Sequence, residues 1–233
     1  DPAACAEVRE RLRDAEPLSE FACKQLLERY GIPVTREGLA TSADRAVELS
    51  RNLGYPVALK AQSGQILHKT EAEVIQLNLA SDDEVRRAYK DVLANARSHA
   101  PNALVEGVLV QEMVRDGVEV IIGVTKDPVF GPAIMFGLGG IFVEALRDVS
   151  FRIAPLTRAD AEEMIDEIRG RRVLEGMRGK PPADREALID ILLRVSQFVT
   201  DHRDQIEELD LNPLVLLPKG AKVVDALITK TSS

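Results

Sequence analysis

Apolar residues in the first half of the chain recur at helical spacing in three segments, with short apolar or alternating runs between them. Each helical segment has a start signal, because Ser19, Ser42 and Ser81 stand where a side-chain oxygen can cap a helix. The pattern predicts helices near 19–30, 42–53 and 81–99 and strands near 56–60 and 74–79. This alternation of helix and strand is typical of a layered α/β unit.

Beyond Pro101 the pattern changes to β-rich runs separated by turn signals, which favours an α+β unit with antiparallel strands. Two hairpins are predicted, one around Arg115-Asp116-Gly117 and one around Pro218-Lys219-Gly220. The predicted strands are 108–114, 118–124, 129–137, 149–154, 208–217 and 222–228, and the predicted helices are 158–169 and 183–201. We expect an N-terminal extension at 1–16, an N-terminal lobe at 17–103 and a C-terminal lobe at 104–233.

Composition excludes several classes of function. The 233-residue chain has a formal net charge of −8, which argues against nucleic acid or an anionic membrane surface as the main partner. No apolar run approaches the roughly 18 residues of a membrane helix, and the N-terminus has charges where a signal peptide needs an apolar stretch. Cys5 and Cys23 make neither a disulfide framework nor a metal cluster. These features predict a cytoplasmic protein that binds no nucleic acid and no membrane.

The closing hairpin is expected to gather polar side chains. Asp210 and Asn212 are two apart on a predicted strand and therefore share a face. The midpoint of the hairpin places Asp225 nearly opposite Asn212 on that face. A hard cation resolves the repulsion between two such carboxylates, and Mg²⁺ accepts carboxylate ligands together with water and substrate phosphates. A polar sheet surface that faces solvent is the alternative interpretation.

Other candidate residues lie on or beside apolar strands. Lys60 ends such a strand, where it is either a fixed cation for phosphates or a lysine that reaches solvent. Glu112 and Glu119 flank the first predicted turn symmetrically, so they should face each other, as a ribose or amine ligand or as a solvated edge. Gly139 and Gly140 end a glycine-rich run that lets backbone N–H groups approach phosphate, although no Walker A or dinucleotide fingerprint is present.

His68 lies in a polar loop after the Lys60 strand and is followed by Lys69, Thr70 and Glu71. A neutral imidazole is a good nucleophile toward phosphorus and can carry a phosphoryl group transiently. A lone histidine in a loop is more often merely exposed, so the residue by itself does not decide between these roles.

Taken in chain order, these pieces resemble one family. The matching runs are GYPVALK at 54–60, HKTE at 68–71, VQEM at 110–113, FGPAIMFGLGGIFVE at 130–144, ELDLNPL at 208–214 and VD at 224–225. They look like the ATP-grasp subunit of the NDP-forming acyl-CoA synthetases, which include ADP-forming acetyl-CoA synthetases and are relatives of succinyl-CoA synthetase. The resemblance covers about residues 17 to 229 and implies an α/β (α+β) ATP-grasp fold, with a nucleotide cleft between two lobes.

The resemblance implies a ligase reaction, acyl-CoA + ADP + phosphate ⇌ acid + CoA + ATP, with ATP/ADP and Mg²⁺ as cofactors. It implies that Lys60 contacts the nucleotide phosphates. Glu112 would lie at the hinge near adenine, and Glu119 would lie near the ribose. Gly139 and Gly140 would form the flexible loop on the phosphate side.

The resemblance further implies that Asn212 and Asp225 bind Mg²⁺ with Asp210 beside them, and that Glu144 lies just behind the glycine loop. His68 matches the second phosphohistidine of the family. The implied partner is a CoA-binding ligase subunit or fused domain that carries the first phosphohistidine. Its phosphoryl group would pass to His68 and then to ADP.

The chain departs from the family pattern at Glu73 and Val74, where the family usually has two glycines. Glu73 adds a negative charge where an anion should dock, and Val74 stiffens the loop. This departure weakens the case for phosphorylation of His68 more than the case for nucleotide binding. Two alternatives therefore stay open. One is a degenerate ATP-grasp scaffold or regulatory domain, like those fused to acetyltransferases in protein-lysine acetylation enzymes, and the other is a carboxylate–amine ligase.

Overall fold

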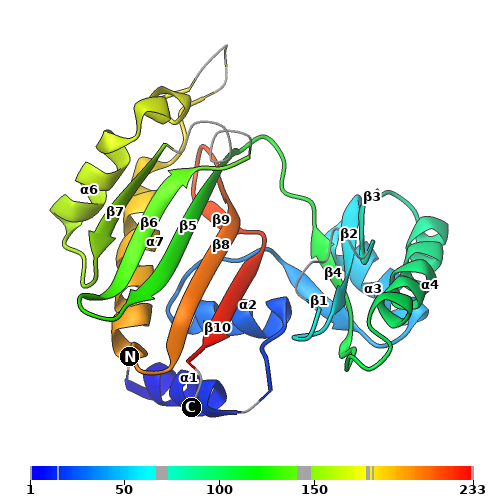
Figure 1. The fold of residues 1–233 in the computed structure, drawn as a ribbon. Coiled ribbons are helices and arrows are strands. Elements are labelled where there is room, and N and C mark those ends of the chain that lie inside the picture. The colour runs from blue at the N-terminus through cyan, green and yellow to red at the C-terminus, as the bar shows by residue number, and fades with distance from the viewer. Residues whose placement is uncertain are drawn as a thin grey trace. The chain divides into compact units, whose positions relative to one another are not determined.

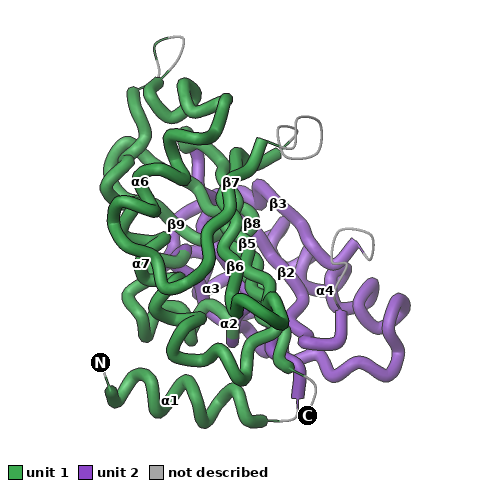
Figure 2. The backbone as a smooth tube through the Cα atoms, turned by 60° about the vertical axis from the view of Figure 1, so that its left-hand side comes forward, with its two compact units in different colours: residues 1–15, 23–34, 116–233 green, residues 16–22, 35–115 purple. Residues whose placement is uncertain are grey.

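The chain forms two compact units, which are coloured separately in Figure 2. The computed structural model describes residues 2–14, 16–66, 73–140, 148–176, 179 and 181–231. Unit 1 comprises 1–15, 23–34 and 116–233, and unit 2 comprises 16–22 and 35–115. Each unit combines helices with an antiparallel sheet, an arrangement that the sequence predicts for the second half of the chain.

Unit 2 is built on a four-stranded sheet in the order β1-β4-β2-β3. Its elements are β1 (Glu37–Ala40), α3 (Ala43–Leu53), β2 (Val57–Gln62), β3 (Ile75–Leu79), α4 (Asp82–His99) and β4 (Gly107–Glu112). Both helices begin at the predicted caps, because the Ser42 and Ser81 side chains accept hydrogen bonds from the third backbone N–H of their helices.

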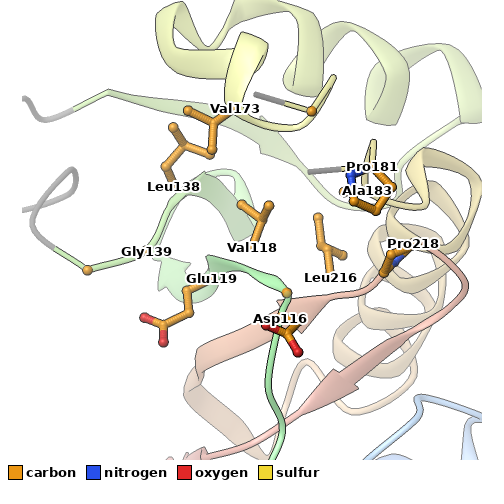
Figure 3. A pocket seen from close by; sticks show the side chains of 13 residues that line it. Asp116, Val118, Glu119, Leu138, Gly139, Val173, Pro181, Ala183, Leu216 and Pro218 are labelled. Atoms are coloured by element: carbon orange, nitrogen blue, oxygen red, sulfur yellow. The ribbon is translucent and has the colours of Figure 1, made fainter. Parts of the chain in front are cut away.

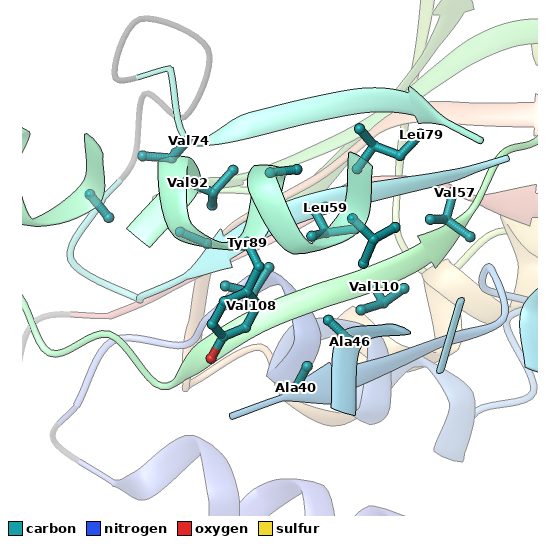
Figure 4. Packing of buried hydrophobic residues seen from close by; sticks show 14 of the residues in the cluster. Ala40, Ala46, Val57, Leu59, Val74, Leu79, Tyr89, Val92, Val108 and Val110 are labelled. Carbon is teal, nitrogen blue, oxygen red and sulfur yellow. The ribbon is translucent and has the colours of Figure 1, made fainter. Parts of the chain in front are cut away.

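The core of unit 2 lies between these helices and one face of the sheet, as Figure 4 shows. Alternate residues of β2 and β4 contribute to it, among them Leu59 and Val110, and α4 contributes Val92 and the ring of Tyr89. Lys60 and Gln111 fall on the other face of the same strands because side chains alternate along a strand.

Unit 1 is built on a six-stranded sheet in the order β10-β8-β5-β6-β7, with β9 paired to β8. Its elements are α1 (Pro2–Arg13), most of α2 (Glu20–Arg29), β5 (Val118–Asp127), β6 (Gly131–Leu138), β7 (Val149–Ile153), α6 (Arg158–Glu167), the 3-10 helix η1 (Arg169–Val173), α7 (Arg185–Asp201), β8 (Ile206–Leu216), β9 (Ala221–Val223) and β10 (Ala226–Lys230). The first three residues of α2 belong to unit 2.

The two faces of the unit 1 sheet differ in character. Val120 and Leu138 pair across β5 and β6 and are buried on the side of η1, where a Cβ on Gly170 would lie 2.5 Å from Leu138. Helices α6 and α7 cover this side in Figure 1. The opposite face, which we call the open face, carries Gly123 of β5 and Asp210 of β8 as a cross-strand pair.

The predicted hairpin between 108–114 and 118–124 is wrong. Strand β4 pairs with β1 and β2 in unit 2, whereas β5 pairs with β6 and β8 in unit 1. All six residues of β4 are buried, so this strand lies between two neighbours inside its own sheet. The expected cross-strand pair is therefore also wrong, because Glu112 lies opposite Val57 and Glu119 lies opposite Val215.

The expected lobe boundary near residue 103 differs from the division into compact units, which falls between Arg115 and Asp116. Residues 104–115 go with unit 2 because β4 hydrogen-bonds to two of its strands. The division into an extension at 1–16 and lobes at 17–103 and 104–233 stays a prediction about functional domains.

A buried aromatic cluster holds the end of α7 in unit 1. The Tyr30 hydroxyl lies 2.9 Å from Nε2 of His202 and donates to the Asp201 carboxylate at 2.9 Å. The rings of Tyr30, Phe198 and His202 pack with centroids 5.0 to 5.7 Å apart. Burial lowers the pKa of His202 from its ordinary 6.5, more than the nearby Asp201 raises it.

We expect this histidine to make unit 1 less stable in mild acid. The unfolded chain takes up the proton near pH 6.5 and the folded chain only at lower pH, so stability is lost as pH falls through 6.5 toward the folded pKa. Thermal melts of the wild type and His202→Asn between pH 5 and 8 measure this effect. The variant should be less stable at pH 8 and should have a flatter pH dependence, and equal slopes would contradict the assignment.

Candidate functional site

The closing hairpin of unit 1 has the register that the sequence predicts. Leu214, Val215 and Leu216 pair with Val223, Lys222 and Ala221 around the Pro218-Lys219-Gly220 turn. The same register continues into β10, where Leu227 lies opposite Asp210. Between these pairs, the backbone N–H of Asn212 donates to the carbonyl oxygen of Asp225 at 3.2 Å. Asn212 and Asp225 are therefore cross-strand neighbours, as expected.

The three polar side chains of this hairpin influence one another. Burial and, to a lesser extent, the negative charges of Asp225 and Glu208 together raise the pKa of Asp210 to about 6, whereas a hydrogen bond from Asn212 opposes the shift. Asp210, Asn212 and Asp225 thus form one cluster, which we call the hairpin cluster. Its carboxylates repel each other in a half-buried setting.

The donor set of the hairpin cluster fits a hard divalent cation. It offers carboxylate and amide oxygens, which are the ligands that Mg²⁺ takes alongside water and phosphate. A cation between Asp210 and Asp225 would relieve the repulsion that raises the pKa of Asp210. Among the described residues, no group of three or more His, Cys, Asp or Glu side chains is arranged as a metal site, and the hairpin cluster has only two carboxylates.

Beside the hairpin cluster, the open face has a hollow of about 320 Å³ that sequence reasoning missed. One cross-strand row runs through it from Leu227 and Asp210 to Gly123, Met135 and Phe151. Leu227 and Phe151 are exposed apolar residues, at 38% and 54% of their surface. The signal for this hollow is spread over five strands, so no local pattern in the sequence reveals it.

Glu119, Gly139 and Gly140 come together where β5 begins and β6 ends. The backbone N–H of Gly139 donates to the carbonyl oxygen of Glu119 at 2.8 Å. A Cβ at Gly139 would lie 2.9 Å from backbone carbon of Glu119, and Gly140 has a φ of +63°, so both positions favour glycine. Alternation along the regular β5–β6 register puts Glu119 on the open face, the same face as Gly123 and Asp210.

A cavity of about 350 Å³ adjoins these three residues, and Figure 3 shows it from close by. Val118, Leu138 and Leu216 give it an apolar lining, to which Val173 and Pro181 also contribute. The Glu119 carboxylate points away from this apolar lining in Figure 3. Glycine backbone and apolar side chains together can accept a flat, partly polar ligand.

Lys60 lies in unit 2 and does not reach solvent. Its ammonium nitrogen is 2.8 Å from Oε1 of Glu20, and the two side chains are exposed by only 5% and 0%. The interpretation of Lys60 as a lysine that extends from a strand end to solvent is therefore wrong. Sequence reasoning missed Glu20, because no spacing rule relates a residue on a helix to one on a strand 40 positions later.

Glu112 is almost fully buried, at 9% exposed, and both of its carboxylate oxygens are engaged. One accepts from the backbone N–H of Arg36 and the other from its guanidinium, each at 2.8 Å. The carboxylate thus fixes the chain before β1 to the end of β4. Its predicted place near adenine stays a prediction.

His68 and Glu144 lie outside the described residues. Glu73 and Val74, where the chain departs from the family pattern, are described. Glu73 has a φ of +51°, a left-handed conformation that favours glycine. Val74 is fully buried in the core of unit 2, and its carbonyl oxygen accepts from the N–H of Ala61 at 3.0 Å. The backbone therefore keeps a turn suited to glycine at 73, while Val74 serves packing.

These features define a protein of the ATP-grasp class, and a family model described as an ATP-grasp domain matches residues 10–229. The acetate–CoA ligase [ADP-forming] II subunit beta of Pyrococcus furiosus is 52% identical over 211 residues, which are 90% of this chain and 89% of that one. This chain belongs to the family of ADP-forming acetate–CoA ligase beta subunits. The acetate–CoA ligase [ADP-forming] I of Archaeoglobus fulgidus is 46% identical, but the match spans 86% of this chain and only 29% of the relative.

Solved structures agree with this assignment. Acetyl-coenzyme A synthetase 1 from Ca. Korarchaeum cryptofilum, in complex with coenzyme A and Ca-AMPCP, superposes with a TM-score of 0.90 at 46% identity, over 97% of this chain and 98% of that one. The same enzyme with coenzyme A and Mg-AMPPCP has its phosphohistidine segment pointing towards the nucleotide binding site, at a TM-score of 0.80, 43% identity, and 98% and 99% coverage. The predicted family, ATP-grasp fold and ligase class are confirmed. Separately, none of the described helices is long and apolar enough to cross a membrane.

The geometry of the hairpin cluster predicts a measurable coupling between its carboxylates. Asp225→Asn should lower the pKa of Asp210 from about 6, without returning it to its ordinary 3.8, because burial is the larger cause. Carboxyl titration by NMR measures this shift. Glu208→Gln is the matched control and should lower the pKa of Asp210 by less. If the pKa of Asp210 is the same in Asp225→Asn as in the wild type, the two side chains lie apart.

Proposed function

We propose that this chain binds ATP and ADP with Mg²⁺ and carries a phosphoryl group on His68, as the nucleotide-binding part of an ADP-forming acyl-CoA synthetase. The hairpin cluster is the observation that carries the proposal. It places an oxygen donor set for Mg²⁺ on an antiparallel sheet, in a chain that is 52% identical to a beta subunit of such a ligase. The overall reaction is acyl-CoA + ADP + phosphate ⇌ acid + CoA + ATP.

In this proposal the residues of each unit have separate tasks. In unit 2, the Lys60 ammonium offsets the negative charge of the nucleotide phosphates, and Glu112 holds the end of β4 close to the adenine. In unit 1, Glu119 faces the ribose, and the backbone of Gly139 and Gly140 approaches the phosphates. These roles require fixed groups, because phosphoryl transfer depends on positioning and on electrostatic stabilisation.

Asn212 and Asp225 would hold Mg²⁺, with Asp210 beside them. When bound, the cation neutralises the charge that builds up on the phosphate oxygens during transfer. The role of the protein is to hold Asp210 and Asp225 oriented at a spacing that the hairpin register sets. In the direction of ATP synthesis, a terminal oxygen of ADP attacks phosphorus and the P–N bond to His68 breaks. The imidazole keeps the electron pair of that bond and takes up a proton.

We propose a CoA-binding ligase subunit or fused domain as the partner that phosphorylates His68. The chain spans 89% of a separate beta subunit and 29% of a longer ligase chain, so the same module stands alone in one relative and is part of a larger chain in another. A cytoplasmic location stays a prediction, as does the absence of nucleic acid and membrane partners.

Labelling with γ-³²P ATP tests the phosphoryl carrier. In the presence of Mg²⁺ and the partner subunit, the chain should acquire acid-labile, base-stable label, and His68→Ala should lose nearly all of it because no acceptor nitrogen remains. His99→Ala is the matched control, since His99 is an exposed histidine of the same unit and should leave labelling unchanged. Label that persists in His68→Ala would mean that another residue carries the phosphoryl group and would overturn this part of the proposal.

Calorimetric binding of ATP with and without Mg²⁺ tests the cation site. Asp225→Asn should weaken Mg²⁺-ATP binding by about tenfold or more, and should change binding of metal-free ATP little, because a carboxylate ligand of the cation is lost. Thr229→Ala, on β10 and away from the hairpin cluster, should leave both affinities unchanged. An equal loss with and without Mg²⁺ would point to a structural role for Asp225.

A further inference from the structure

The buried ion pair between Lys60 and Glu20 is the strongest feature that the proposed function does not explain. The ammonium nitrogen lies 2.8 Å from Oε1 of Glu20, and neither side chain reaches solvent appreciably. Both residues belong to unit 2. Lys60 is on β2 between β4 and β3, and the residues directly opposite it, Leu109 and Ile75, are apolar.

Stability by itself does not account for this pair. Removing an ammonium and a carboxylate from water costs more free energy than their attraction usually returns, and apolar residues of similar volume often stabilise a protein as well or better. Removing one partner is much worse, because a charge then stays buried without its counter-charge. We therefore infer that the function of the protein requires a charged lysine at this position.

Several contacts of the first turn of α2 hold Glu20 beside the strand. The Ser19 hydroxyl accepts from the backbone N–H of Ala22 at 3.4 Å and donates to the Glu106 carboxylate at 3.0 Å. The backbone N–H of Phe21 donates to Oε1 of Gln62 at 3.0 Å. Gln62 lies two positions after Lys60 on β2, so the same strand anchors the helix start at two points.

The chain before α2 packs just as closely. A Cβ on Gly64 would lie 2.3 Å from the carbonyl oxygen of Pro17, so only glycine allows the approach. The position of the Glu20 carboxylate thus follows from backbone contacts on both sides of it. A carboxylate fixed in this way can fix the ammonium that it contacts.

We propose that Glu20 is a positioning residue that acts through Lys60. Its carboxylate holds the Lys60 ammonium at a fixed position in a buried setting, ready for the phosphates of the nucleotide. An ammonium has three N–H donors, so a hydrogen bond to Glu20 is compatible with bonds to phosphate oxygens. This inference rests on the proposed contact of Lys60 with the nucleotide phosphates.

The test compares nucleotide binding in the full chain for the wild type, Glu20→Gln, Glu20→Asp and Lys60→Met. The probes are Mg²⁺-ATP, which has phosphates, and adenosine, which has none. Glu20→Gln should weaken Mg²⁺-ATP binding by about tenfold and leave adenosine binding unchanged, because only the phosphate contact depends on the ammonium. Glu20→Asp keeps the negative charge but moves it back by one methylene, so its loss of ATP affinity should be smaller. Because the charge pair is kept, this variant should fold even if Glu20→Gln does not.

A double-mutant cycle shows whether Glu20 acts through Lys60. In the Lys60→Met background, Glu20→Gln should have no further effect on ATP affinity, and the double variant should melt at a higher temperature than Glu20→Gln alone. Ser42→Ala is the matched control for stability. It removes the cap of α3 in the same unit, away from Glu20 and Lys60, and should lower the melting temperature without changing ATP affinity.

The outcomes separate this inference from the proposed function. Unchanged ATP affinity in a folded Lys60→Met variant would overturn the phosphate role of Lys60 and the inference with it. Weakened ATP binding in Lys60→Met, with unchanged binding in folded Glu20→Gln and Glu20→Asp, would overturn the inference alone. Equal loss of ATP and adenosine binding in Glu20→Gln would show a structural effect and would also overturn it.

Discussion

An ammonium within a sheet must have an anion at hydrogen-bond distance, and this constraint organises the part of unit 2 around Lys60. The carboxylate of Glu20 meets it at 2.8 Å, which requires the start of α2 to lie against β2. The bond from Phe21 to Gln62 and the close approach of Pro17 to Gly64 secure that placement. The start of α2, strand β2 and Gly64 therefore all contribute to pairing the Lys60 ammonium with a carboxylate.

Unit 1 presents the opposite charge problem. Asp210 and Asp225 are held close enough for the charge of one to raise the pKa of the other, and the protein supplies an amide from Asn212 as partial relief. A cation would relieve the repulsion between these carboxylates, just as a phosphate would complement a fixed ammonium. Mg²⁺ and a nucleotide are ligands of the charges that these two arrangements would bind.

The sequence predicted those parts of the site that local geometry decides. A tight Pro-Lys-Gly turn determines the register of the closing hairpin, so Asn212 and Asp225 could be paired by arithmetic. The same arithmetic failed for Glu112 and Glu119, because β4 is buried on both faces and pairs with strands distant in sequence. Glu20 and the hollow beside Asp210 were missed for a related reason, since each depends on which elements come together in three dimensions.

The departure at Glu73 and Val74 separates two kinds of chemistry in this chain. Glu73 keeps a left-handed backbone without glycine, and Val74 is packed in the core, so the turn keeps its course while its side chains differ from the family pattern. The hairpin cluster depends on the register of β8 and β10 in unit 1, and Glu20 lies on α2, so neither includes residues 73 and 74. The strand of Lys60 contacts Val74 through a backbone hydrogen bond from Ala61, which does not depend on the side chain at position 74. The proposed nucleotide contacts therefore rest on geometry that the departure leaves in place, whereas the proposed phosphoryl transfer to His68 depends on the segment that ends there.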